Sequence, residues 1–267
     1  MLVRCATPLS VRPGRRRPSD LSGRRAASAV GTGDPALIDD LVAANRILFQ
    51  QGVVDGFGHV SVRHPARSDA FLLARSMAPA LVTAGDIMAF DFDAVPLDGD
   101  DRPAYLERFI HSEIYRTRPD VMAVVHSHSP NVIPFGIVKT VKLQPVCHMS
   151  GFIGAAAPVF EIRETAGDAS DMLVRDRTLG AALAASLGSS SVVLMRGHGS
   201  TVVGTGIRQV VFRAIYTEVN ARLQSEAMRL GTPTVLTPAE AENSARTNDG
   251  AMHRAWDLWR RAAMGDG

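Results

Sequence analysis

The chain has 267 residues, of which 46% are hydrophobic and 21% charged, proportions that support a real core and are ordinary for a globular enzyme. The formal net charge of +2 is uneven: residues 1–30 carry seven arginines and one acid, Asp20, for a formal +6, which leaves −4 elsewhere. We therefore expect no nucleic-acid partner. No secretory apolar core or run of eighteen apolar residues is present, and Cys5 and Cys147 predict no disulfide framework, so we expect no membrane partner and a cytoplasmic protein.

Residues 1–33 are rich in Arg, Ser, Pro and Gly and lack apolar periodicity, which predicts a disordered basic tail. The Arg- and Ser-rich composition resembles a transit peptide but has no clear amphipathic pattern, and we favour an extended start of the chain or a loose leader. Residues 34–267 are predicted to form one α/β domain, since no internal repeat is visible.

The first half of this domain begins with a helix, because Asp34 is a good N-cap and Pro35 fits the first helical position. A glycine-rich turn then leads into closely spaced strands, which predicts an antiparallel run. The predicted elements are a helix over 35–50, strands over 59–63, 71–73 and 87–92, a helix from Pro103 to about Arg116, and a strand over 121–126.

The second half is predicted to alternate helices with short strands. Gly231 and Pro233 mark the end of the longest helix. The predicted elements are a helix from Asn131, strands over 142–146 and 157–160, a helix over 173–187, a strand over 191–195, a helix over 207–230 and a last helix from Pro238. These elements predict a mainly antiparallel central sheet with helices packed on it.

Three histidines follow two buried strands. His126 and His128 are two residues apart, so an extended backbone directs both imidazoles to one face. His198 stands between two glycines after a second apolar strand. Three such side chains predict a metal site with open coordination positions. Glu107 is a candidate fourth ligand or acid/base, and His111 lies four residues further on.

Several motifs together resemble the class II aldolase/adducin family. They cover about Ala36 to Leu236 and are His126-Ser127-His128, Gly197-His198-Gly199, Glu107 nineteen residues before His126, Arg118-Pro119-Asp120, and the segment Gly58-His59-Val60-Ser61-Val62-Arg63. The resemblance implies an α/β/α sandwich fold and a homo-oligomer, usually a tetramer, with the active site at a subunit interface.

The resemblance also implies roles for individual residues. His126, His128 and His198 match the metal ligands, and Glu107 matches the catalytic acid/base or alternating ligand. Because the non-catalytic adducins have lost such ligands, the three histidines favour an enzyme.

The chain departs from the sugar-phosphate aldolases of the family around the predicted site. Those enzymes usually carry Asn where His59 stands, Thr-Gly near Arg75-Ser76, and a serine pair before the glutamate, whereas Tyr105-Leu106 precede Glu107 here. The hydroxyl pair that helps to cradle a phosphate is missing, and Arg75 offers a planar donor suited to a carboxylate. We therefore predict that Arg75, Ser76 and His59 bind a small carboxylic acid. Two further histidines are candidates for the pocket, His111 and His148.

Longer segments resemble one subgroup of the family. These segments are residues 56–65, 75–79 and 106–111. The subgroup includes decarboxylases of pyridine dicarboxylates from vitamin B6 breakdown. It also includes aminocoumarin-pathway enzymes that shorten prenylated hydroxyphenylpyruvate to the benzoate and are described as non-haem iron oxygenases or as decarboxylases.

The predicted function is metal-dependent decarboxylation of a hydroxylated aromatic or aryl 2-oxo acid. An oxidative version with Fe(II) and O2 would convert prenylated hydroxyphenylpyruvate to hydroxybenzoate in antibiotic biosynthesis. We expect one divalent ion, with Fe2+ favoured and Mn2+ or Zn2+ as alternatives. Two other functions stay open: a class II aldolase that cleaves an unphosphorylated hydroxy-oxo acid, and a non-catalytic, adducin-like oligomerisation module.

Overall fold

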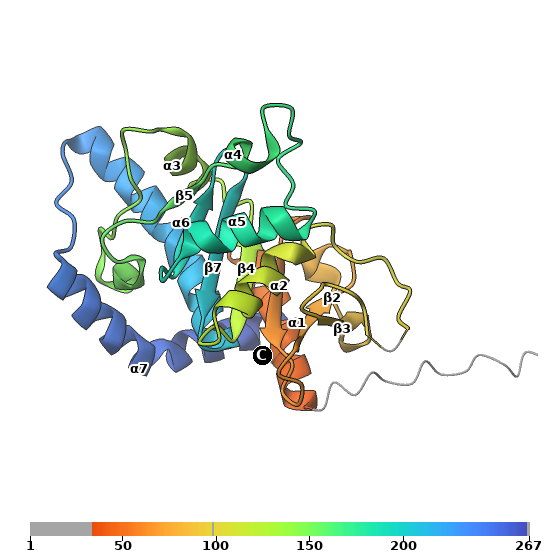
Figure 1. The fold of residues 1–267 in the computed structure, drawn as a ribbon. Coiled ribbons are helices and arrows are strands. Elements are labelled where there is room, and N and C mark those ends of the chain that lie inside the picture. The colour runs from red at the N-terminus through yellow and green to blue at the C-terminus, as the bar shows by residue number, and fades with distance from the viewer. Residues whose placement is uncertain (1–33, 98, 266–267) are drawn as a thin grey trace, which may run out of the picture.

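The computed structural model describes residues 34–97 and 99–265, so the predicted tail over 1–33 lies outside the described residues. A seven-stranded sheet in the order β3-β2-β1-β4-β7-β6-β5 forms its centre (Figure 1). The strands are β1 (His59–Arg63), β2 (Ala70–Ala74), β3 (Ile87–Asp91), β4 (Ala123–Ser127), β5 (Val159–Phe160), β6 (Val192–Met195) and β7 (Gly199–Gly204). Neighbouring strands pair antiparallel except for the parallel pair β5–β6, which confirms the predicted sheet.

Helices cover both faces of the sheet. One face packs against α1 (Pro35–Gln50), α6 (Ile207–Leu230) and α7 (Pro238–Met264), and the other against α2 (Arg108–Thr117) and α5 (Arg177–Leu187). Shorter elements lie in the connections: α3 (Ile133–Ile137), α4 (Arg163–Ala166), and the 3-10 turns η1 (Pro79–Leu81), η2 (Ala84–Asp86) and η3 (His148–Ile153). The architecture is the predicted α/β/α sandwich.

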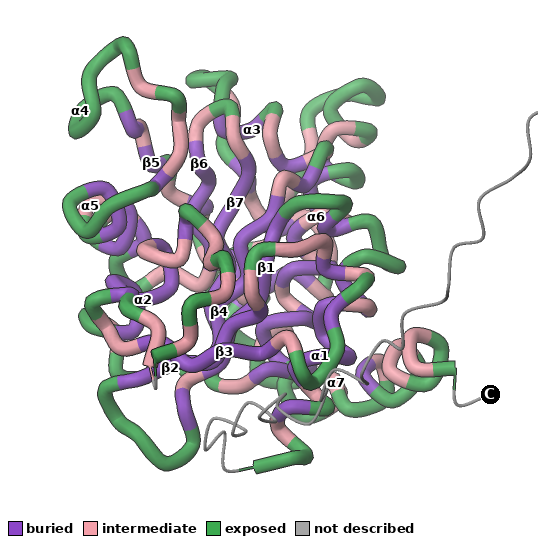
Figure 2. The backbone as a smooth tube through the Cα atoms, turned by 90° about the vertical axis from the view of Figure 1, so that its right-hand side faces the viewer, coloured by how far each residue is buried: buried purple, intermediate pink, exposed green. Residues whose placement is uncertain are grey.

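Side chains on β4 alternate between the two cores. Ala123 and Val125 pack in the core under α1 and α6, whereas Val124 packs in the core under α2 and α5. This period of two places His126 on the same face as Val124. Figure 2 shows the strands as the buried interior, with exposed backbone mostly in outer helices and loops. The predicted metal ligand thus emerges from the centre of the fold.

The helix termini follow the capping signals in the sequence. The Asp34 carboxylate accepts a hydrogen bond from the Ala36 amide at 3.0 Å, and Pro35 occupies the first turn of α1. Thr237 and Glu240 form a reciprocal capping box at the start of α7. Both predicted helix starts are confirmed.

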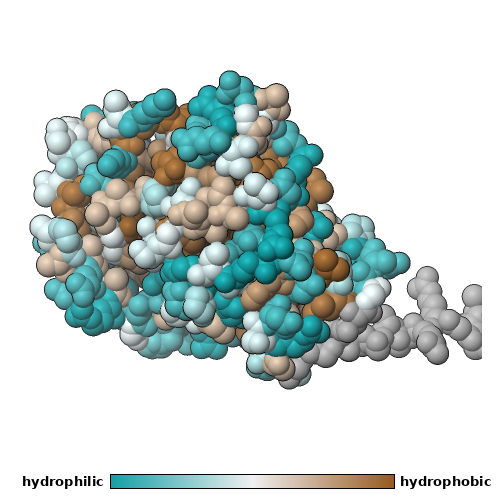
Figure 3. Space-filling model, in the orientation of Figure 1, coloured by the Kyte–Doolittle hydropathy of each residue, from teal (hydrophilic) through white to brown (hydrophobic). Residues whose placement is uncertain are grey.

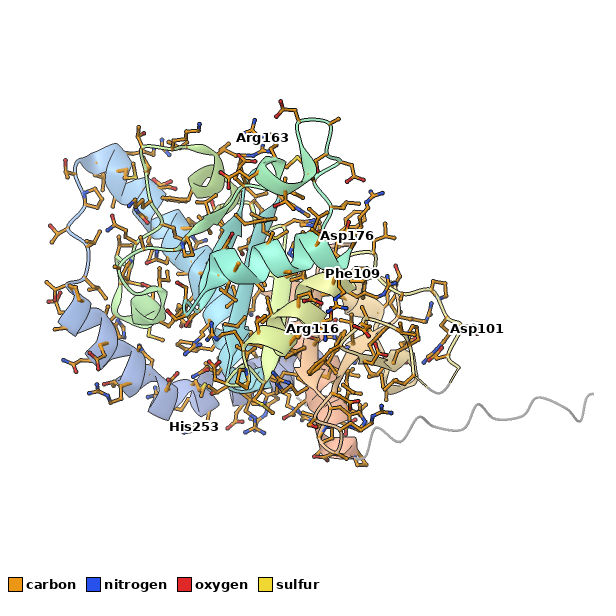
Figure 4. The ribbon with its side chains drawn as sticks, in the orientation of Figure 1. Asp101, Phe109, Arg116, Arg163, Asp176 and His253 are labelled. Atoms are coloured by element: carbon orange, nitrogen blue, oxygen red, sulfur yellow. The ribbon has the colours of Figure 1, made fainter. Side chains whose placement is uncertain are left out.

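Helices α2 and α5 pack closely because Gly180 lies against the backbone of α2. A Cβ at position 180 would lie 2.5 Å from the Phe109 carbonyl oxygen, too close for any side chain. Figure 4 shows Phe109 and Asp176, the N-cap of α5, near each other at the starts of these two helices. The packing holds the N-terminal end of α2, where Glu107 stands, beside the segment that precedes α5.

Helix α2 begins at Arg108, so the prediction of a helix from Pro103 is wrong. The backbone before it is used in other contacts: the Pro103 carbonyl accepts from the Ser76 amide at 2.7 Å, and the Tyr105 hydroxyl donates to the Met77 carbonyl at 2.5 Å. Glu107 is the N-cap residue but makes no side-chain cap. Its carboxylate is free for the site described below.

The predicted strand over 142–146 is also wrong, because this segment bonds to side chains instead of to another strand. Gln224 on α6 accepts from the Gln144 amide at 3.0 Å and donates to the Lys142 carbonyl at 2.8 Å. Asn220, one turn earlier, accepts from the Val146 amide at 2.9 Å and donates to the Gln144 carbonyl at 2.8 Å. Two buried amide side chains thus satisfy the segment.

The remaining differences concern strand β7 and the bounds of some elements. Strand β7 was not predicted, because glycines at both ends and two hydroxyl residues hide its apolar part. The predicted helices from Asn131 and over 173–187 are shorter, α3 and α5, and the strand over 157–160 contracts to β5.

The described helices include none that combines the length and apolarity needed to cross a bilayer. On the face seen in Figure 3, hydrophobic side chains occur in small groups among hydrophilic ones.

Candidate metal centre

Four predicted residues converge at one point of the sheet: His126, His128, His198 and Glu107 each direct one ligand atom to it, and these atoms lie within 4.8 Å of one another. The His128 Nε2 atom is 3.2 Å from His126 Nε2 and 3.0 Å from His198 Nε2. The Glu107 Oε2 atom is 3.4 Å from His126 Nε2 and 3.5 Å from His198 Nε2. The structure therefore brings the predicted set together.

Strand pairing explains how residues seventy positions apart meet. On β4, His126 pairs with Thr201 of β7, and Ser127 pairs with Ser200. His198 precedes β7 in a tight turn, where its amide donates to the Met195 carbonyl at 3.0 Å and Gly197 has a φ of +65°. The turn returns the chain beside the end of β4 and delivers His198 next to His128.

Backbone carbonyls determine which imidazole nitrogen is available in two of the histidines. Nδ1 of His126 is 3.2 Å from the Ser200 carbonyl, and Nδ1 of His198 is 3.0 Å from the Met172 carbonyl. A carbonyl only accepts, so both Nδ1 atoms carry the proton and both Nε2 lone pairs face the centre. Such outer contacts are typical of histidines that ligate metals.

The Glu107 carboxylate is also held by an outer contact. Its Oε1 atom accepts from the Val174 amide at 3.0 Å, which leaves Oε2 facing the histidines. Burial raises the pKa of this carboxyl, whereas positive charge on His126 and His198 and the N–H of Val174 lower it, with a net value of about 2. When the histidines are neutral, a bound dication would supply this positive charge instead. Glu107 is therefore ionised at neutral pH and can bind a cation or take up a proton.

The donor set fits a divalent metal ion. Ligand atoms ~2.0–2.2 Å from a zinc-type dication lie about 2.9–3.6 Å apart in octahedral or tetrahedral arrangements. Four of the ligand-atom separations, at 3.0 to 3.5 Å, fall in this range. Burial, with His126 as the next cause, lowers the pKa of His198 to about 4 and also lowers that of His128, so both imidazoles are neutral, as ligands must be.

His59 and His111 lie directly beside this centre. On β1, His59 pairs with His126, and the two imidazole centroids are 5.1 Å apart. His59 Nδ1 is 2.6 Å from His111 Nε2, and His111 Nδ1 is 2.6 Å from the Ser61 hydroxyl. The predicted pocket histidine His111 is fully buried behind His59 rather than in the pocket itself.

A pocket of about 400 Å³ opens onto the centre. Phe57 and Leu106 stand at its exposed rim, with 68% and 58% of their surfaces exposed. The lining residues include Phe57, His59, Ser76, Met77, Tyr105, Leu106, Glu107, His128 and Leu173. The pocket is thus mainly apolar, with polar groups near the four convergent side chains.

Two other predicted contacts lie elsewhere. Arg75 donates from Nε to Asp86 Oδ1 at 2.7 Å and is not among the residues that line the pocket, so its contact with substrate stays a prediction. His148 is exposed in η3, where its carbonyl accepts from Asn248 of α7 at 2.7 Å. A larger cavity of about 540 Å³, beside α3 and β5, contains none of the predicted site residues.

The sequence did not reveal the parts of the site that hold the others in place. The backbone of Met172 and Val174 comes from an irregular segment with no motif. Ser61 and Tyr115 had a weak signal: Ser61 is two residues after His59 on a strand, and Tyr115 is four after His111 on a helix.

Comparisons with known proteins agree with this geometry. Residues 39–225 match the family described as Class II Aldolase and Adducin N-terminal domain. The chain is 40% identical over 243 residues to decarboxylase tropJ of Talaromyces stipitatus, across 82% of this chain and 91% of that protein. It is 33% identical to 3,4-dihydroxyphthalate decarboxylase of Arthrobacter keyseri, across 72% of this chain and 78% of the relative.

The fold also agrees with a solved structure. L-fuculose 1-phosphate aldolase from Glaciozyma antarctica PI12 superposes with a TM-score of 0.69 at 22% identity, across 85% of this chain and 88% of that chain. The match over most of the chain confirms the predicted family: this protein belongs to the class II aldolase and adducin family.

Proposed function

We propose that the protein is a divalent-metal-dependent decarboxylase of a hydroxylated aromatic acid. The observation that carries this proposal is the cluster of three histidines and Glu107 at the inner end of a mainly apolar pocket. Similarity to tropJ and to 3,4-dihydroxyphthalate decarboxylase supports the reaction type, and the name of the second relative supports the substrate class.

The metal ion would be held by the imidazole nitrogens of His126, His128 and His198, with Glu107 beside them. When bound, such an ion supplies Lewis acidity toward the carboxylate and hydroxyl oxygens of a substrate. The apolar rim of Phe57 and Leu106 suits an aromatic ring.

Glu107 is the residue placed to move a proton. Its carboxylate is ionised and lies at the pocket wall, so it can accept the proton of the phenolic hydroxyl. It then returns this proton to the ring carbon as the bond from that carbon to the carboxylate breaks and CO2 leaves. The products are CO2 and the phenolate of the shortened arene, and no oxidant is needed. We therefore take the non-oxidative reaction as the first candidate.

Ser76 and His59 line the pocket and are proposed to contact the polar groups of the substrate. Arg75, whose Nε donates to Asp86, is proposed to contact the substrate carboxylate through its Nη atoms. The homotetramer implied by the family is part of the proposal, and sedimentation equilibrium measures it directly.

The test is CO2 release from a panel of hydroxylated aromatic and aryl 2-oxo acids, with protein loaded with Fe2+, Mn2+ or Zn2+. We expect metal-dependent release of one CO2 per arene formed, at the same rate with and without O2. O2 consumption with Fe2+ alone would select the oxidative conversion of an aryl 2-oxo acid instead. Release of an aldehyde together with pyruvate and without CO2 would select the aldolase, and the absence of stoichiometric metal would select the oligomerisation module.

A further inference from the structure

A chain of four buried polar side chains runs away from the metal centre, between β1 and α2. His59 Nδ1 lies 2.6 Å from His111 Nε2, His111 Nδ1 lies 2.6 Å from Ser61 Oγ, and Ser61 Oγ lies 2.8 Å from the Tyr115 hydroxyl. All four residues are at most 4% exposed. His59 and Ser61 are two residues apart on β1, and His111 and Tyr115 are four apart on α2. Each pair therefore lies on one face of its element, and the two pairs face each other.

The far end of the chain determines the direction of its hydrogen bonds. The Tyr115 hydroxyl has one proton to donate, and Ser61 is the side chain bonded to it. A buried hydroxyl proton without an acceptor is costly, so Tyr115 donates to Ser61.

The other bonds follow from this one. Ser61 accepts from Tyr115 and therefore donates to His111 Nδ1. His111 then carries its proton on Nε2 and donates to His59 Nδ1. Burial lowers the pKa of His111 to about 3, in agreement with a neutral imidazole that has one donor and one acceptor.

We infer that Tyr115, Ser61 and His111 are positioning residues that hold His59 with its proton on Nε2, as an N–H donor toward an oxygen atom of the ligand in the pocket. Nδ1 of His59 is occupied by His111, and His59 lines the pocket beside Glu107 and His128, so Nε2 is the nitrogen left for a ligand. The ligand class, a hydroxylated aromatic carboxylate, rests on the proposed function.

The direction matters for what the pocket accepts. With the proton on Nε2, His59 is a neutral donor suited to a carboxylate or phenolate oxygen. With the opposite direction it would present a lone pair, and a bound anion would meet a second acceptor beside Glu107. A one-way chain excludes that arrangement without placing another positive charge next to the metal ligands.

The direct test is the tautomer of His59 in the full chain loaded with Zn2+. Two-bond 1H–15N correlation spectra of 15N-histidine protein distinguish Nδ1–H from Nε2–H imidazoles, and the signals that vanish in His59→Gln and His111→Gln assign the two rings. We expect Nε2–H for both. A proton on Nδ1 of His59 in the wild-type protein overturns the inference, whatever the enzyme's activity.

Variants test whether the chain sets this state. In Ser61→Ala and Tyr115→Phe we expect an Nδ1–H form of His59 to appear and the Kd of salicylate, a hydroxylated aromatic carboxylate, to rise on the order of tenfold at unchanged zinc content. Ser112→Ala is the matched control, since its hydroxyl bonds to Phe109 within α2. Spectra of Ser61→Ala and Tyr115→Phe identical to wild type would overturn the positioning role.

The readouts separate the two proposals. A wild-type protein with Nε2–H on His59 that neither binds salicylate nor releases CO2 contradicts the proposed function and leaves the hydrogen-bond chain intact. The reverse result, turnover with an Nδ1–H His59, contradicts the chain alone.

Discussion

Val174 donates its backbone N–H to Glu107 Oε1 at 3.0 Å, from a segment that also holds His198, a candidate metal ligand. Two residues earlier, the Met172 carbonyl accepts from His198 Nδ1 at 3.0 Å. Met172 has a φ of +70°, a conformation that is uncommon for a residue with a side chain. The strained segment before α5 therefore orients both Glu107 and one of the three histidines.

Replacement of Glu107 by Gln removes the group that moves the proton while it keeps the shape of the side chain. We expect kcat to fall by about 10² to 10⁴, the usual contribution of a general acid/base. Because the three histidines remain, metal content by elemental analysis should stay near that of wild type. Glu164→Gln, an exposed carboxylate on α4, is the control. Turnover by the Glu107 variant at the wild-type rate would contradict the assignment.

Replacement of His128 by Ala removes one of three imidazole ligands. Loss of an outer contact to a ligand costs about 10- to 100-fold in metal affinity, so loss of the ligand itself should cost more than about 100-fold. Metal titration followed by calorimetry measures this, and CO2 release should vanish with the metal. The exposed His148→Ala variant serves as the comparison and should bind metal as wild type does. Full activity of the His128 variant without metal is the result that would contradict the site.

Gly199 is the position where β7 approaches β4 most closely. An added Cβ would overlap the Ser127 carbonyl oxygen, so a larger residue must push the two strands apart. We expect Gly199→Ala to lower the free energy of unfolding by roughly 1–3 kcal/mol. We also expect weaker metal binding, because His126 and His128 lie at the end of β4 and His198 lies just before β7. Gly206→Ala is the control, because its φ of 177° suits any residue and its Cβ would meet open space. Equal stability of the two variants would show that the strands can separate freely.

His111 should make the stability of the metal-free protein depend on pH. Burial lowers its pKa from 6.5 to about 3, so between these values the unfolded chain binds a proton that the native protein does not. The full stability is present above pH 6.5 and is lost as the pH falls toward 3. At pH 5 the loss from one such group is roughly 2 kcal/mol.

Urea unfolding at pH 7 and pH 5 in EDTA measures this effect. The loss of stability between the two pH values should be smaller in His111→Gln than in wild type by about that amount. His253→Gln, at an exposed position on α7 (Figure 4), should lose as much as wild type does. Identical losses in all three proteins would contradict a buried neutral His111.

The clustering of His126, His128 and His198 could be predicted from sequence because the position of each depends on local geometry. A strand directs residues two apart to one face, which identified His126 and His128, and glycines on both sides marked His198 as the product of a tight turn. Glu107 was a candidate fourth ligand or acid/base, and the family resemblance matched it to that role. The mainly antiparallel sheet could also be predicted from local spacing. Several successive strands are joined by segments too short for the crossover connection that parallel neighbours need.

What could not be predicted depends on contacts between distant segments. Arg75 looked available for a carboxylate, but Asp86 lies eleven residues on and pairs with it in the fold. The segment over 142–146 looked like a strand, but Asn220 and Gln224 take the place of a neighbouring strand. No periodic pattern in the chain encodes such partners.

The segment over 172–174 has a consequence for changing the substrate range of the enzyme. Because one short stretch of backbone holds both Glu107 and His198, any insertion there would disturb metal retention and proton transfer together. The side chains of Phe57 and Leu106, by contrast, are exposed at the pocket rim. Engineering for larger or smaller aromatic acids would therefore vary that rim and leave the loop before α5 untouched.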